Sequence, residues 1–181
     1  MGFRAFDAND DDLPALTMLN AVLGSGSSSR LFQNVREEKA LVYSIYNYVD
    51  QYTDAGSMGT YMSATEENVL DAIETTARTY RELKDGGLTD GELQRVKNLV
   101  KGALIRGMES TSRRLYTLAK GTMLVGKPRS LEERLSRLDA VTEEDVMRVA
   151  EKVIRPEGLN VVMYSDDVAS MKDFKPTQLD F

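Results

Sequence analysis

The chain has 181 residues, of which 41% are apolar, 23 are Lys or Arg and 29 are Asp or Glu, as in an ordinary one-domain globular protein. With no His and no Cys it cannot build a Ser-His-Asp or Cys-His nucleophile, a thiol redox centre, or a zinc site with nitrogen and sulfur ligands. The net charge of −6 argues against nucleic acid as a partner, because nucleic-acid binding draws on clustered Lys and Arg.

The N-terminal quarter predicts a short strand, a helix, a loop and a second helix. Residues 2–6 are extended in character and start so close to the first residue that we expect a longer strand to have been cut there. From Asp12 to Leu23 apolar residues recur at helical spacing, and Gly24 closes the helix. The run GSGSSS at residues 24–29 then breaks the period before a second, shorter helix.

The next segment predicts an antiparallel hairpin. Residues 41–52 are rich in Tyr, Val and Ile and alternate, a turn follows at 53–56, and residues 57–64 alternate again. The alternation places Tyr43, Ile45, Asn47 and Val49 on one face and Ser44, Tyr46, Tyr48 and Asp50 on the other.

The remaining elements are mainly helices. Four of them have start signals, which are Thr65, the capping box Thr89-x-x-Glu92, Ser130-x-x-Glu133 and Thr142-x-x-Asp145. A further helix is predicted over residues 112–125. The apolar run 159–164 predicts a final buried strand. We therefore expect an α+β fold, a two-layer sandwich of a mostly antiparallel sheet with helices on one face, in one domain over residues 1–165. Residues 166–181 are expected to form a C-terminal tail.

The Gly/Ser loop is the first candidate site. It lacks the Gly-Lys-Ser/Thr ending of a phosphate loop and follows a helix, which argues against phosphate binding. Two interpretations remain, a plain connector or a mobile element that touches a peptide. For the second, Gly24, Ser25, Gly26 and Arg30 are the candidate contacts.

Arg36 and Tyr43 form the second candidate site. The turn between them can bring a guanidinium and a phenol to one edge of the sheet, where both donate hydrogen bonds to carbonyl oxygens or to a developing oxyanion. The alternative is a surface arginine that pairs with Glu37 or Glu38 and a half-buried core tyrosine. Scattered acidic residues without a calcium-loop pattern predict no metal site in this chain.

Four segments resemble the second half of the M16 metallopeptidases, the family of pitrilysin, insulin-degrading enzyme and the mitochondrial processing peptidases. They are 19–24 (LNAVLG), 28–44 (SSRLFQNVREEKALVYS), 87–97 (GLTDGELQRVK) and 141–150 (VTEEDVMRVA), in the expected order and spacing. The similarity runs over residues 3–164.

The resemblance implies two homologous halves that close like a clamshell around a peptide substrate. The N-terminal half binds zinc through an inverted His-x-x-Glu-His motif, and the C-terminal half adds an Arg and a Tyr seven residues later. Arg36 and Tyr43 match that pair, and the absence of His makes this chain the zinc-free half. The loop at 24–29 matches the position of the processing peptidases' glycine-rich loop but is shorter.

The expected cofactor is zinc in a partner catalytic half, which is either part of the same parent chain or a separate subunit. The alternative function is a structural, non-proteolytic subunit of a larger complex. A cut first strand would also leave a sheet edge that could pair two copies into a homo-oligomer. We expect no membrane span, because no stretch approaches the roughly 20 apolar residues required. The sequence fits the bacterial cytoplasm and the periplasm equally.

Overall fold

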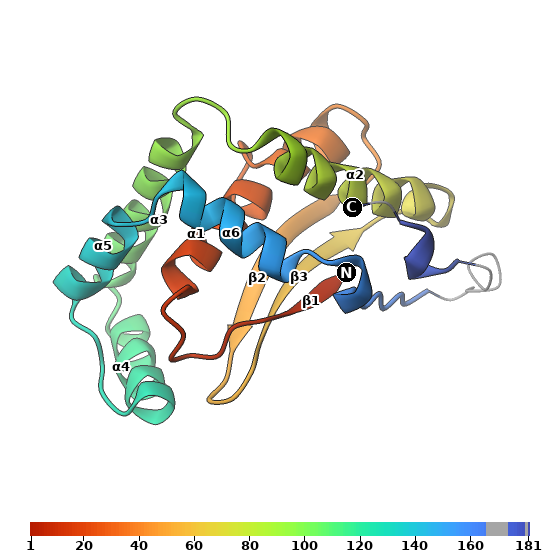
Figure 1. Ribbon diagram of the computed structural model, residues 1–181. Coiled ribbons are helices and arrows are strands. Elements are labelled where there is room, and N and C mark those ends of the chain that lie inside the picture. The colour runs from red at the N-terminus through yellow and green to blue at the C-terminus, as the bar shows by residue number, and fades with distance from the viewer. Residues whose placement is uncertain (166–173, 180) are drawn as a thin grey trace.

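The sheet has three antiparallel strands, and the computed structural model describes residues 1–165, 174–179 and 181. Strands β1 (Gly2–Ala5), β2 (Ser44–Gln51) and β3 (Gly56–Ser63) lie in the order β1-β3-β2 (Figure 1). The predicted first strand and hairpin are both present, because alternation of buried and exposed side chains is a local property that fixes the pairing register.

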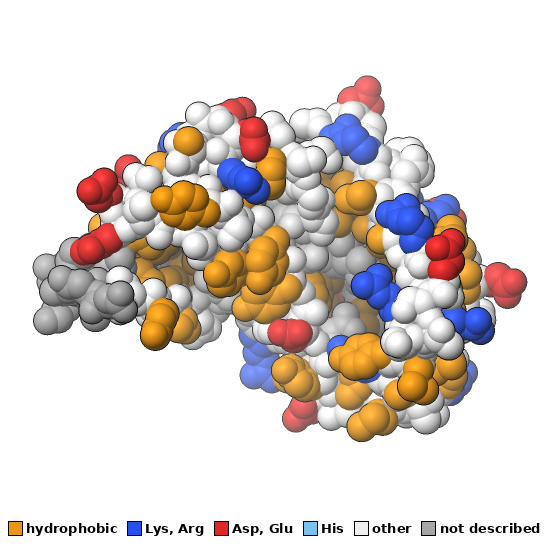
Figure 2. Space-filling view, turned by 180° about the vertical axis from the view of Figure 1, so that it is seen from behind, with side chains coloured by type: hydrophobic (Ala, Val, Ile, Leu, Met, Phe, Trp, Pro, Cys, Tyr) orange, Lys and Arg blue, Asp and Glu red, His pale blue; other side chains and the backbone are white. Residues whose placement is uncertain are grey.

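The two faces of the sheet differ sharply. Phe3, Ile45 and Met58 point into the core and are almost completely buried. On the opposite face Tyr46 and Tyr61 stack across the strands with ring centroids 5.0 Å apart, and both remain about half exposed. Seen from behind, hydrophobic side chains, a class that includes Tyr in this view, gather near the centre of the molecule (Figure 2). The alternation predicted for residues 44–50 is therefore confirmed.

The helical layer covers one face only, as predicted for a two-layer α+β sandwich. Its helices are α1 (Leu13–Gly24), α2 (Val69–Gly86), α3 (Glu92–Gly107), α4 (Thr111–Val125), α5 (Leu131–Asp139) and α6 (Glu143–Val153). In Figure 1, α1 and α6 cross in front of the sheet, and α4 stands away from it. No residue of α4 is buried. Among the described residues, no helix combines the length and apolar content that crossing a membrane requires.

A buried polar chain ties α2 to the sheet. The Thr60 hydroxyl donates to the Asn47 side-chain oxygen at 2.6 Å, and the Tyr80 hydroxyl bonds to Thr60. Burial raises the pKa of Tyr80, so this phenol stays protonated. Because Thr60 already donates its hydroxyl hydrogen to Asn47, Tyr80 is the donor to Thr60. Leu179 is also buried, and the ring of Phe181 stacks on Tyr80 at 6.2 Å. These described parts of the predicted tail pack on α2, whereas residues 166–173 and 180 lie outside the described residues.

The predicted strand over residues 159–164 is wrong. Only Asn160 pairs with the sheet, through two hydrogen bonds of 2.8 Å with Gly2. In that antiparallel register, the residues after Val161 lie past Met1, so no backbone of the described chain stands opposite them. Val162 and Tyr164 are accordingly exposed. An apolar run shows a preference for a strand but does not supply the neighbour that the strand needs.

One predicted helix start also differs from the structure. Helix α3 begins at Glu92 rather than at Thr89, because Gly91 adopts a left-handed φ of 68° and interrupts the chain before it. The Asp12 side chain does not cap α1. Its carboxylate instead accepts hydrogen bonds from Arg148 at 2.7 Å and Lys152 at 2.9 Å, which connects the start of α1 to α6.

Candidate functional site

The segment between α1 and β2 contains a π-helix in place of the predicted second α-helix. It spans Phe32–Glu37, and its hydrogen bond from the Glu38 amide to the Gln33 carbonyl is 2.9 Å long. Such helices are rare, and they occur frequently at functional sites. The chain then reverses at Ala40, which has a positive φ of 51°.

This reversal brings the start of β2 back to the end of the π-helix. The Leu41 amide donates to the Val35 carbonyl at 3.0 Å. This bond joins the backbone just before Tyr43 to the backbone just before Arg36. The Tyr43 amide in turn donates to the Ser63 carbonyl at 2.7 Å, which fixes it to the sheet. Backbone bonds thus position both candidate residues at one end of the β2–β3 pair.

The side chains of Arg36 and Tyr43 are both open to solvent. Arg36 lies over the ring of Phe32, with its guanidinium carbon 4.8 Å from the ring centroid, and it has no ion-pair partner within the described chain. Tyr43 is 70% exposed. The structure therefore shows neither the Glu37 or Glu38 ion pair nor the half-buried core tyrosine of the alternative interpretation. Both side chains are free to donate hydrogen bonds to a ligand.

Gly24 and Gly26 of the Gly/Ser loop have different roles. Gly24 is buried where α1 crosses β2, and a Cβ built on it would lie 2.4 Å from the backbone nitrogen of Asn47. Its lack of a side chain therefore serves packing. Gly26 is exposed with a φ of 85°, and nothing lies within 4 Å of the corresponding Cβ position. Ser25 donates its amide to Ala21 and ends α1. Gly26 is therefore exposed to solvent, and Ser25 remains partly exposed.

Arg30 is engaged within the fold. Its Nε donates to Glu92 at 3.0 Å, and one terminal nitrogen donates to Glu92 at 2.6 Å and to the Gly87 carbonyl at 2.7 Å. Burial alone would raise the pKa of Glu92, but the hydrogen bonds from Arg30 and Thr89 outweigh it and lower the pKa. This pair holds the segment after the loop against α3.

Sequence reasoning missed the Arg30–Glu92 pair because 62 positions separate its members. Glu92 was explained by the local capping box, and its contacts with the Thr89 amide and hydroxyl are indeed present. A buried acidic residue at a helix start is consistent with both roles. The sequence carries no signal that distinguishes them.

The described chain holds no cluster of three or more possible metal ligands. Without His or Cys, its residues do not fit a zinc ion. The chemistry within reach of Arg36 and Tyr43 is therefore hydrogen-bond donation to a carbonyl group or an oxyanion.

One protein-family model and several known proteins are similar to this chain. The family model described as "Peptidase M16 inactive domain" matches residues 1–100. The uncharacterized zinc protease YmxG of Bacillus subtilis is 36% identical over 153 residues, which are 84% of this chain and 37% of that protein. The mitochondrial-processing peptidase subunit alpha of Neurospora crassa is 28% identical over 169 residues, which cover 85% of this chain and 29% of that subunit.

A solved protease from Helicobacter pylori has a similar fold. It superposes with a TM-score of 0.76 at 21% identity, over 85% of this chain and 37% of that structure. The chain thus spans between 29% and 37% of the length of these three relatives.

Proposed function

Because the chain belongs to the peptidase M16 inactive-domain family, we propose that it works as the zinc-free half of a two-half zinc peptidase. In this role it completes the chamber that encloses a peptide substrate. Arg36 and Tyr43 donate hydrogen bonds to the substrate backbone beside the zinc site of the partner half. The partner's zinc would supply the activated water.

The observation that carries the proposal is the free state of the two donors. Arg36 has no ion pair in the described chain, and Tyr43 is 70% exposed, yet the backbone around both is fixed by hydrogen bonds. Donors that are positioned before the substrate arrives stabilise a developing oxyanion without reorganisation during the reaction. An exposed edge strand next to them could also pair with an extended peptide.

The test restores a zinc-binding M16 half, from the parent chain or from a separate subunit, and measures peptide cleavage. Arg36→Ala and Tyr43→Phe are each expected to lower turnover by about 10² to 10³, the usual effect of a lost oxyanion donor. Matched controls are Arg155→Ala and Tyr52→Phe, both at exposed positions away from the pair.

Near-normal turnover in both Arg36→Ala and Tyr43→Phe would contradict the proposal. That result would favour the alternative of a structural, non-proteolytic subunit. A thermal unfolding curve beside each activity measurement separates lost chemistry from lost folding, because an exposed ion pair or phenol contributes at most about 1 kcal/mol to stability.

A further inference from the structure

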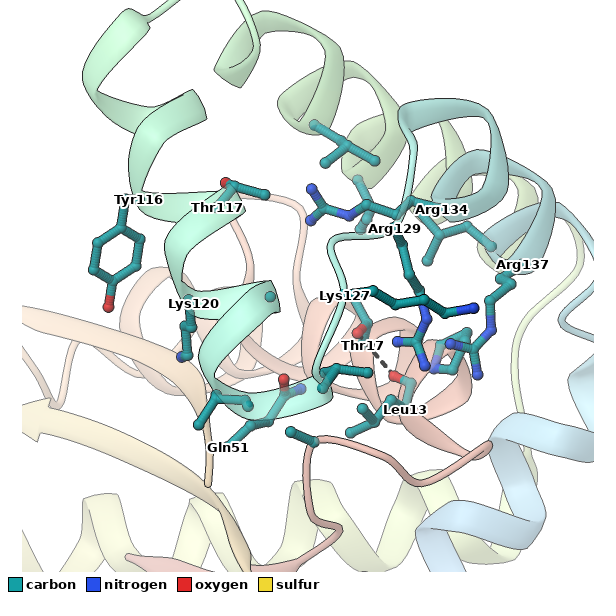
Figure 3. A pocket seen from close by; sticks show the side chains of 18 residues that line it. Leu13, Thr17, Gln51, Tyr116, Thr117, Lys120, Lys127, Arg129, Arg134 and Arg137 are labelled. Atoms are coloured by element: carbon teal, nitrogen blue, oxygen red, sulfur yellow. Dashed lines mark hydrogen bonds between the residues drawn. The ribbon is translucent and has the colours of Figure 1, made fainter. Parts of the chain in front are cut away.

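A cavity of about 370 Å³ lies between α4 and the body of the domain. Its inner wall is apolar and comes from α1, α3 and α5, with Leu13, Leu104 and Leu138 among the lining residues. Figure 3 shows α4 closing one side with Tyr116, Thr117 and Lys120. In the view from behind, the surface is hollowed beside the lobe that α4 forms (Figure 2).

The charges around this cavity are all positive. Its basic lining residues are Lys120, Lys127, Arg129, Arg134 and Arg137, and no Asp or Glu of the described chain lines it. The chain as a whole carries a net charge of −6, so this cluster of positive side chains is opposite in sign to the chain's net charge. In Figure 3 the side chains of Lys127, Arg129 and Arg137 gather on one side of the cavity, whereas Arg134 points toward Thr117 of α4 and Lys120 points away from them.

The basic side chains are poorly neutralised. Arg129 contacts Glu133 at 3.5 Å and Arg137 contacts Asp11 at 3.4 Å, but both carboxylates are at least half exposed, so water screens these pairs. The side chain of Arg134 has no ion-pair partner in the part of the chain that the structure describes. Its pKa lies below the ordinary value, first because the group is desolvated and second because Arg129 lies nearby.

We propose that this cavity binds an acidic segment of a peptide, with a large apolar side chain against the inner wall and carboxylates paired with Lys127, Arg129 and Arg134. The inference rests on the proposed function in taking the ligand to be a peptide. Guanidinium groups bind carboxylates with paired, charge-assisted hydrogen bonds. A ligand carboxylate carries a negative charge, so it would offset the repulsion between Arg129 and Arg134, whereas a neutral water molecule brings no opposite charge.

The position of the cavity suits a peptide that also reaches Arg36 and Tyr43. Gln51, the last residue of β2, lines the cavity, whereas Tyr43 directly precedes the first residue of the same strand. Strand β2 has eight residues, and at roughly 3.3 Å per residue it spans about 26 Å. An extended peptide of about eight residues would cover that length.

The test measures binding to the chain itself by fluorescence anisotropy. The probe is a labelled ten-residue peptide with a central Asp-Glu-Leu-Asp, and the control peptide carries Asn-Gln-Leu-Asn instead. We expect the acidic peptide to bind at least about tenfold more tightly, with an affinity that falls as salt is raised. Equal affinity for both peptides would overturn the proposal.

The variants locate the binding site. Arg134→Gln and Lys127→Gln are each expected to weaken acidic-peptide binding about tenfold or more, whereas Arg155→Gln outside the cavity should change it less than about twofold. Lys127 is exposed, so its variant remains informative if Arg134→Gln does not fold. Unchanged binding in the Lys127 variant, or equal displacement of the probe by inorganic phosphate or oleate, would refute a peptide site here.

This assay involves no cleavage and no partner half. A failure would therefore leave the Arg36 and Tyr43 test untouched. Conversely, normal turnover of the Arg36 and Tyr43 variants would leave a measured cavity affinity in place.

Discussion

Removing the Arg30 side chain tests the internal contact that fixes the segment leading to the π-helix. In Arg30→Met, the carboxylate of Glu92 stays buried and keeps only its contacts with Thr89. The side chains of Arg30 and Glu92 are 17% and 6% exposed, so little water can replace the lost guanidinium.

The expected loss follows from this geometry. Breaking a buried ion pair by removing one partner costs 3–5 kcal/mol, and the Thr89 contacts place Arg30→Met at the lower end, about 3 kcal/mol. For a domain of this size that corresponds to a fall in melting temperature of roughly 6–12 °C. Glu92→Gln should cost less, about 1–2 kcal/mol, because a neutral amide still accepts a hydrogen bond from Arg30.

The pH dependence gives a second check. The pKa of Glu92 is lowered in the folded state, so its contribution to stability is present above its ordinary pKa near 4.5 and is lost as the pH falls below that value. The difference in unfolding free energy between the native chain and Glu92→Gln should therefore shrink between pH 7 and pH 3. The assay is urea unfolding at both pH values.

A loss below about 1 kcal/mol in Arg30→Met, or a loss as large in Glu92→Gln as in Arg30→Met, would refute this reasoning. The first result would mean that water screens the pair. The second would mean that the effect comes from packing rather than from an uncompensated charge.

Two further predictions concern helix α1. Gly24→Ala should lower the free energy of unfolding by at least about 2 kcal/mol, because the new Cβ would meet the Asn47 backbone. The control Gly26→Ala has open space around it but a left-handed φ, and it should lower that free energy by about 1 kcal/mol in thermal unfolding. Equal losses in the two variants would contradict the packing argument. Hydrogen bonds from Arg148 and Lys152 hold the pKa of Asp12 at about 2. Asp12→Asn should therefore lose about 1 kcal/mol at pH 7, and the loss should fade as the pH drops from 4 toward 2. A loss independent of pH would count against it.

The sequence predicted those parts of the fold that depend on neighbouring residues. The hairpin follows from alternation within 41–52 and 57–64, and the capping box at Thr142 and Asp145 forms as expected because both partners lie within one turn. The strand predicted at 159–164 failed because its pairing depends on a distant neighbour.

The candidate site shows the same division between local and distant contacts. The turn between Arg36 and Tyr43 could be predicted because Tyr43 lies only seven positions after Arg36, although the π-helix that carries Arg36 could not. The basic residues of the cavity come from α4, α5 and the loop between them. Its opposite wall includes residues of α1, which lies about 100 positions earlier in the sequence. No window of the sequence contains that arrangement.

The most direct test of the central claim is complementation. A fixed amount of a zinc-binding M16 half is titrated with this chain, and cleavage of a fluorogenic peptide is followed. The account predicts that neither half cleaves alone and that activity rises with added chain until the two are equimolar. Full activity of the zinc-binding half without this chain, or no activity at any ratio despite a complex of the two halves seen by size-exclusion chromatography, would contradict it.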